Sequence, residues 1–248
     1  MLKAILLDLD GTLLANPMET FIPAYLAGLG RYLANHVAPE RLVAELLCAT
    51  RAMDANDGSD ATNQETFAAA FFPALGVARQ ALEPAFARFY AEEFPRLKAL
   101  TTPVEAARPL VRWAFERSLQ VAIATNPLFP RTAIEQRLAW AGVPVEEFPY
   151  ALVTTYEDMH ATKSNPAYYR EILARLGREP HECLMAGDDW DWDIRPALEL
   201  GLHAWWVAPP DTPRPAGGSA LLGQGSLEDL LALARAGGPP AGPPATGR

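Results

Sequence analysis

Residues 6–13 read Leu-Leu-Asp-Leu-Asp-Gly-Thr-Leu, and they follow on from a short run, residues 2–7, that is apolar apart from Lys3 and has the length of a buried β-strand. Side chains alternate along an extended chain, so we expect Asp8 and Asp10 to project the same way as the strand ends. Gly11 can take a turn that a residue with a Cβ resists, and Thr12 places a hydroxyl beside the turn amides. Two carboxylates at the end of an apolar strand are costly unless a cation or a proton compensates them. The stretch therefore predicts a functional site, with a solvated acidic turn as the alternative interpretation.

The composition limits the kind of protein and its partners. The chain has 248 residues, 50% of them hydrophobic, which is enough for one large domain or two smaller ones. A formal net charge of −9 argues against nucleic acid as a partner, because phosphate backbones need clustered Lys and Arg. No leader pattern and no apolar run of roughly 18 residues is evident. Cys48 and Cys183 are expected to be reduced and buried, so we predict a cytoplasmic protein without a membrane partner.

From about residue 103 onward, strand-like and helix-like segments alternate. Strands are expected at residues 119–124, 150–154, 183–186 and 203–207, and helices at residues 104–117, 131–141, 165–176 and 194–200. Alternation of this kind implies parallel strands joined by crossover helices. The predicted fold class is α/β, with a doubly wound, Rossmann-like parallel sheet as its core.

Residues between about 15 and 98 follow a different pattern. Helical spacing occurs at residues 21–33, 39–53, 64–72 and 84–94, with no convincing strand. The predicted domains are an α/β core from residues 1–15 and 99–236 and a helical cap from residues 16–98, followed by a disordered tail at 237–248. A last core helix is expected at residues 227–235. The polar residues 54–62 are either a specificity loop of the cap or a solvated connector.

Polar side chains fall at the ends of four expected strands, where ligands bind in doubly wound sheets. They are Asp8 and Asp10 after the first, Thr125 and Asn126 after the second, Lys163 after the third, and Asp188 and Asp189 after the fourth. Lysine is scarce, with three residues against eighteen arginines, which makes Lys163 more informative. Carboxylates with one lysine and one hydroxyl suit a divalent cation and a phosphate, and Mg²⁺ prefers oxygen ligands.

These motifs resemble those of the haloacid dehalogenase (HAD) superfamily, in the subgroup with a helical, C1-type cap inserted after the first motif. The motifs that match, in order, are Asp8-Leu-Asp10-Gly-Thr, Thr125-Asn126, Lys163, and Gly-Asp-Asp-Trp-Asp-Trp-Asp at residues 187–193. They span residues 1 to about 207. Two departures occur: Lys163 is followed by Ser-Asn-Pro166, and the spacing to Asp193 fits either Asp188 or Asp189 as the preceding acidic residue.

The resemblance implies a role for each motif residue. Asp8 would attack phosphorus and form an aspartyl-phosphate, while Asp10 would protonate the leaving oxygen and then deprotonate water. Lys163 would relieve repulsion among the carboxylates. The implied phosphate-binding residues are Gly11, Thr12, Thr125, Asn126 and Lys163. The implied ligands of Mg²⁺ are Asp8, Asp10 through its carbonyl, and Asp188 or Asp189, with Asp189 expected to be the closer one and Asp193 to support it.

Within this resemblance, Asp10 separates the possible reactions. Dehalogenases of the family lack the second aspartate, and phosphonate hydrolases need a cap lysine, whereas the insert has none before Lys98. The predicted function is a Mg²⁺-dependent phosphomonoesterase acting on a small phosphorylated metabolite such as a sugar phosphate, phosphoglycolate or a nucleotide, as a monomer or homodimer. A phosphomutase on a sugar phosphate, a non-catalytic phospho-ligand-binding protein and a protein acting through a partner stay open.

Overall fold

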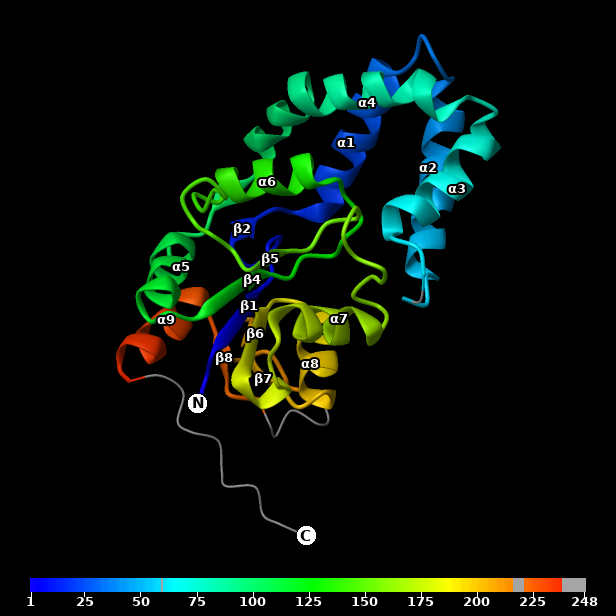
Figure 1. The fold of residues 1–248 in the computed structure, drawn as a ribbon. Coiled ribbons are helices and arrows are strands. Elements are labelled where there is room, and N and C mark those ends of the chain that lie inside the picture. Colours follow the sequence, from blue (N-terminus) through cyan, green and yellow to red (C-terminus); the bar gives the residue numbers. More distant parts are fainter. Residues whose placement is uncertain (59, 216–220, 238–248) are drawn as a thin grey trace.

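A six-stranded parallel sheet forms the centre of the computed structural model, which describes residues 1–58, 60–215 and 221–237 (Figure 1). The order across the sheet is β5-β4-β1-β6-β7-β8, and each neighbouring pair is parallel. The first strand of the chain therefore lies in the middle. This confirms the predicted doubly wound α/β fold. The strands are β1 (Ala4–Leu7), β4 (Gln120–Ile123), β5 (Leu152–Val153), β6 (Cys183–Gly187), β7 (His203–Val207) and β8 (Gly223–Gly225).

Helices cover both faces of this sheet, as Figure 1 shows. One face packs against α5 (Ala107–Glu116), α6 (Arg131–Trp140) and α9 (Leu227–Arg235), and the other against α7 (Ala167–Leu176) and α8 (Arg195–Glu199). Ile5 and Leu7 of β1 belong to the first apolar cluster, whereas Ala4 and Leu6 belong to the second. A strand buried on both faces needs an uninterrupted apolar sequence, which residues 4–7 supply.

A helical segment lies beyond the carboxyl ends of the strands, coloured blue to green-cyan in Figure 1. It contains α1 (Met18–Tyr32), α2 (Pro39–Asp54), α3 (Asn63–Leu75) and α4 (Arg79–Glu92), then the 3₁₀ segment η1 (Phe94–Leu100). An antiparallel ribbon of β2 (Leu14–Ala15) and β3 (Thr102–Pro103) brings its two ends side by side. Its buried residues share the apolar cluster of one sheet face. The division into core and cap domains stays a prediction.

Some details differ from the expectations. The short strands β2, β3 and β8 were not predicted, because two or three residues carry no periodicity. Asn165 and Pro166 are predicted as the N-cap and first-turn residues of a helix, but α7 begins at Ala167 with Pro166 at the N-cap, and the Ala167 N–H donates to the Asn165 side chain at 2.9 Å. The residues 238–248 of the predicted tail lie outside the described part of the chain.

The two cysteines have different environments. Both are free, and Cys183 is buried as expected, but Cys48 is exposed. The correction follows from the geometry of α2, whose buried face holds Leu42, Leu46, Ala49 and Met53 and leaves position 48 on the solvent side. Among the helices of the described residues, none has the length and apolarity that crossing a membrane requires.

Candidate active site

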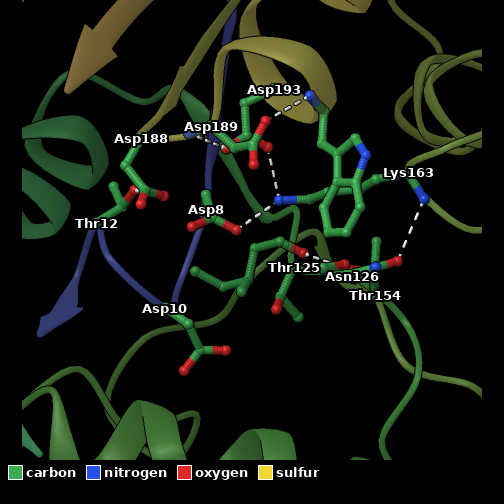
Figure 2. Close-up of polar contacts among 12 residues, drawn as sticks. Asp8, Asp10, Thr12, Thr125, Asn126, Thr154, Lys163, Asp188, Asp189 and Asp193 are labelled. Atoms are coloured by element: carbon green, nitrogen blue, oxygen red, sulfur yellow. Dashed lines mark hydrogen bonds and ion pairs between the residues drawn. The ribbon is translucent and has the colours of Figure 1, made fainter. Parts of the chain in front are cut away.

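The sequence motifs meet at the carboxyl ends of the central strands β1, β4 and β6 (Figure 2). Asp8 follows β1 directly, and its backbone N–H donates to the Ala186 carbonyl of β6 at 3.0 Å. On the other side, the Ala124 N–H donates to the Leu7 carbonyl at 2.8 Å. The main-chain ladder therefore extends to Asp8 and fixes where its carboxylate emerges.

Lys163 joins two of the predicted carboxylates. Its Nζ donates to Asp8 Oδ1 at 2.5 Å and to Asp193 Oδ1 at 2.6 Å. All three side chains are buried, with 4% exposure for Asp8, 5% for Lys163 and 1% for Asp193. Burial opposes the charge of Lys163, but Asp193 and Asp8 together raise its pKa well above the ordinary value. The lysine is therefore held as an ammonium between two carboxyl groups.

The carboxyl groups outnumber this ammonium. Asp8, Asp188 and Asp193 each place one oxygen within 4.8 Å of the others. Desolvation, followed by the charge of Asp8, raises the pKa of Asp188 to about 7, and burial raises the pKa of Asp193 to about 7 against the effect of Lys163. Asp8 Oδ2 is buried and has no hydrogen-bond partner among the described residues. An orphaned carboxylate oxygen beside two further acidic groups fits a divalent cation with oxygen ligands.

The positions of Asp188 and Asp189 correct one expectation. Asp189 Oδ1 accepts the backbone N–H groups of Asp191 at 2.8 Å and Trp192 at 2.9 Å. It thereby caps the π-helical turn η3 (Trp190–Ile194), whose first N–H groups need an acceptor. Asp188 is the member of the pair that lies near Asp8, so the expectation that Asp189 is the closer group is wrong.

Two glycines make room for the acidic groups. Gly11 has φ +89°, and a Cβ there would collide with the Asp188 carboxylate. A Cβ at Gly187 would in the same way overlap the side chain of Asp193. Thr12, next to the first glycine, donates its hydroxyl to Asp188 Oδ1 at 3.4 Å. The two close approaches explain why glycine occupies both positions.

Asp10 lies below Asp8 in Figure 2, and no dashed line joins the two carboxylates. Its carboxylate accepts hydrogen bonds from Asn16 Nδ2 at 2.8 Å and from Arg137 Nη1. That the two aspartates project the same way stays a prediction. Regular β-structure ends at Leu7, and in the turn that follows the N–H groups of Leu13 and Leu14 both donate to the Leu9 carbonyl.

Arg137 was not among the predicted site residues. It comes from α6, is 1% exposed, and places its guanidinium carbon 4.6 Å from the centroid of the Phe129 ring. A signal for it was present in the sequence: position 137 falls three residues after Ile134 and four after Ala133, on the apolar side of the helix. A charged residue on such a face indicates a buried partner.

The loops after β4 and β5 are joined to each other. Asn126 Oδ1 accepts the backbone N–H of Lys163 at 3.2 Å. The Thr125 carbonyl accepts the hydroxyls of Thr154 at 2.7 Å and Tyr168 at 2.9 Å. Thr125 itself is 3% exposed. The segments that hold the predicted phosphate-binding residues Thr125, Asn126 and Lys163 therefore form one rigid wall of the site.

Comparison with known proteins agrees with this fold. Residues 2–201 match the family of haloacid dehalogenase-like hydrolases, and the chain belongs to that family. A phosphoserine phosphatase from Thermus thermophilus is 31% identical over 138 residues, which cover 53% of this chain and 53% of that protein. The match thus spans about half the length of this curated relative.

Solved structures share the fold at low sequence identity. A HAD phosphatase from Thermococcus onnurineus superposes with a TM-score of 0.58 and 22% identity, covering 96% of this chain and 99% of that one. A 2-haloacid dehalogenase from Pseudomonas syringae gives a TM-score of 0.64 with 20% identity, covering 95% and 99%. Because phosphatases and dehalogenases both appear, these likenesses show the fold and not the reaction.

Proposed function

We propose that this hydrolase is a Mg²⁺-dependent phosphomonoesterase of small phosphorylated metabolites, with Asp8 as its nucleophile. The observation that supports it best is the surroundings of Asp8: the Lys163 ammonium holds one oxygen, and the other has no hydrogen-bond partner among the residues that the structure describes. Asp188 and Asp193 lie next to it. A carboxylate fixed through one oxygen and open at the other can attack a phosphorus atom.

The proposed reaction uses the remaining residues around this carboxylate. Asp8 Oδ2 forms a bond to phosphorus while the bond to the ester oxygen breaks, and Lys163 balances the charge. Gly11, Thr12, Thr125 and Asn126 are proposed to bind the phosphoryl oxygens. Mg²⁺, when bound, supplies charge compensation for the phosphoryl group. Its proposed ligands are Asp8, the Asp10 carbonyl and Asp188, with Asp193 beside them.

Asp10 is the proposed general acid and base. It would give its proton to the leaving alkoxide, and later take one from the water that hydrolyses the aspartyl-phosphate. In the structure this carboxylate is bonded to Asn16 and Arg137 instead. We therefore propose that its side chain turns from these partners toward Asp8 during the reaction.

Phosphoester hydrolysis is favoured over dehalogenation for two reasons. Asp10 is present, and departure of a halide needs no acid. The curated relative named above is a phosphatase. The net charge of −9 favours a small-molecule substrate over nucleic acid. A cytoplasmic location and a monomeric or homodimeric state stay predictions.

The test compares the wild type with Asp8→Asn on a panel of phosphoesters, with Mg²⁺ and with EDTA. The panel contains phosphoserine, phosphoglycolate, sugar phosphates, nucleotides and ethyl phosphate, plus 2-chloropropionate with chloride release as readout. We expect phosphate release that needs Mg²⁺ and falls by about 10³-fold or more in Asp8→Asn. Equal turnover by both proteins, or chloride release alone, would overturn the proposal.

A further inference from the structure

A cavity of about 430 Å³ lies between helices α1–α4 and the segment that follows β4. Aromatic rings dominate its wall, among them Phe67, Phe72, Phe86, Phe129 and Tyr156. The volume falls within the range of small-molecule sites. None of the acidic residues near Asp8 lines it, so the cavity is a compartment next to the active site.

The floor of the cavity is close to the catalytic groups. We call the part of the wall formed by Leu128, Phe129 and Pro130 the floor of the cavity. This segment begins two residues after Asn126 in the chain. The Phe129 ring also lies 4.6 Å from the guanidinium carbon of Arg137, which bonds to Asp10. The side chains of Phe129 and Arg137 therefore link this part of the cavity wall to Asp10.

Helix α3 fixes the opposite wall to the same loops. Its first residue, Asn63, is fully buried, and its Nδ2 donates to the carbonyls of Pro127 at 3.4 Å and Ala161 at 3.1 Å. These carbonyls lie beside Asn126 and Lys163 in the chain. Gln64, Phe67 and Ala68, which come next on α3, line the cavity. Cavity and phosphate-binding loops thus have a defined relative position.

The polar groups of the wall are mostly paired with one another. Arg79 and Glu83 form an ion pair at 2.5 Å, and the hydroxyls of Tyr25 and Tyr90 share a hydrogen bond at 2.9 Å. A polyol that enters such a cavity gives up the hydrogen bonds of its hydroxyls to water and finds few protein groups to replace them. An apolar group has no such hydrogen bonds to give up, and its transfer out of water is favourable.

We propose that this cavity receives the organic part of the substrate, and that the preferred substrates are phosphomonoesters of aromatic or branched aliphatic alcohols. This inference rests on the proposed function. It disfavours sugar phosphates and other polyol phosphates as substrates. The phosphoryl group at Asp8 and the apolar group in the cavity would be recognised separately.

The experiment compares primary alkyl phosphates, whose leaving groups are chemically alike. They are 2-phenylethyl phosphate, glycerol 3-phosphate and, as the smallest reference, ethyl phosphate. We expect kcat/KM for 2-phenylethyl phosphate to exceed that for glycerol 3-phosphate by about 100-fold, the scale of discrimination that an apolar pocket reaches. Most of this difference in kcat/KM is expected to come from a lower KM for 2-phenylethyl phosphate.

A pair of variants on α3 locates the effect. Ala68 lines the cavity, and Ala68→Trp fills it; Ala69 is exposed and absent from the wall, so Ala69→Trp is the matched control. The readout is the ratio of kcat/KM for 2-phenylethyl phosphate to that for ethyl phosphate. We expect the ratio to fall at least about tenfold in Ala68→Trp and to hold in Ala69→Trp.

The outcomes separate the two proposals. If ethyl phosphate is hydrolysed in an Asp8-dependent way but glycerol 3-phosphate equals or exceeds 2-phenylethyl phosphate, the cavity inference fails and the proposed function stands. An unchanged ratio in Ala68→Trp also overturns it. If no ester is hydrolysed by the wild type, the proposed function fails. Protection of Asp8→Asn against heat by 2-phenylethyl phosphate, and not by glycerol 3-phosphate, would then still support an apolar ligand site.

Discussion

Arg137 and Asp10 form a buried ion pair in the candidate active site, in addition to the two pairs of Lys163. Arg137 is 1% exposed and Asp10 10%, and Asn16 completes the partners of the carboxylate. The Nη2 atom of Arg137 has no hydrogen-bond partner within the described residues. Taking one member away from such a pair leaves the other charge buried, which commonly costs about 3–5 kcal/mol.

This pair predicts strong coupling between two substitutions. Arg137→Met should lower the free energy of unfolding by about 3 kcal/mol, and the loss should shrink when Asp10→Asn is added, because the uncompensated charge is then gone. Urea unfolding of the two single variants and the double variant measures the coupling. Additive effects within about 0.5 kcal/mol would show that the two side chains do not depend on each other.

At this scale the sequence predicts which residues gather, and less well how they are oriented. Asp8, Lys163 and Asp188 are found together because strand ends in a parallel sheet converge. The partners of Asp10 and the capping role of Asp189 depend on individual side-chain hydrogen bonds. Such bonds are set by backbone geometry that neither spacing nor periodicity reports.

Helix α3 is the element that ties the helical segment to the loops of the site. The N–H groups of its first two residues, Asn63 and Gln64, donate to the carbonyls of Met159 at 2.8 Å and Tyr156 at 2.7 Å. The Asn63 side chain adds its bonds to the loops after β4 and β5. Thr62 and Glu65 form a capping box on the same turn.

We predict that Asn63→Ala loosens α3 from these loops. Two buried carbonyls lose the Asn63 side chain as a donor, and the free energy of unfolding should therefore fall by about 1–3 kcal/mol. Hydrogen exchange should therefore speed up along α3 and at Lys163 N–H more than in β1. Thr62→Ala is the matched control, since it removes the cap at a cost of about 1 kcal/mol and leaves the loop carbonyls bonded. Equal acceleration in β1 and α3 would argue against a local docking role.

The elements themselves follow from the sequence to different degrees. Long helices and the central strands could be predicted, because their apolar residues repeat with a clear period or form a buried run. The ribbon β2–β3 could not, since it depends on two segments of the chain, near residues 14 and 103, that meet only in the folded molecule. Pairing at such a distance leaves no local trace.

For the molecule as a whole, the acidic group links folding to cation binding. Asp8, Asp188 and Asp193 approach one another only in the folded state, so a cation that they hold stabilises that state alone. At a concentration 100 times its dissociation constant, Mg²⁺ should raise the free energy of unfolding by about 2.7 kcal/mol. For a chain of this size, this corresponds to a rise in Tm of about 5–10 °C.

Two neighbouring substitutions test this linkage by thermal unfolding with and without Mg²⁺. Asp188→Asn should raise Tm in EDTA, because it relieves repulsion, and should remove most of the Mg²⁺ response. Asp189→Asn keeps an oxygen for the capped turn and should retain the response. The reverse pattern would restore Asp189 as the ligand, and no Mg²⁺ response in the wild type would contradict cation binding.

The central place of β1 also has a consequence for biosynthesis. This strand is made first, but its neighbours are β4, ending at Ile123, and β6, ending at Gly187. At about 5–20 residues per second, the ribosome needs on the order of 10 s to supply both. Until residue 123 has been made, this apolar segment that ends in two aspartates has no partner strand on either edge, and until residue 187 it has at most one. The nascent chain must therefore keep a fully buried strand from aggregating until both neighbouring strands have been translated.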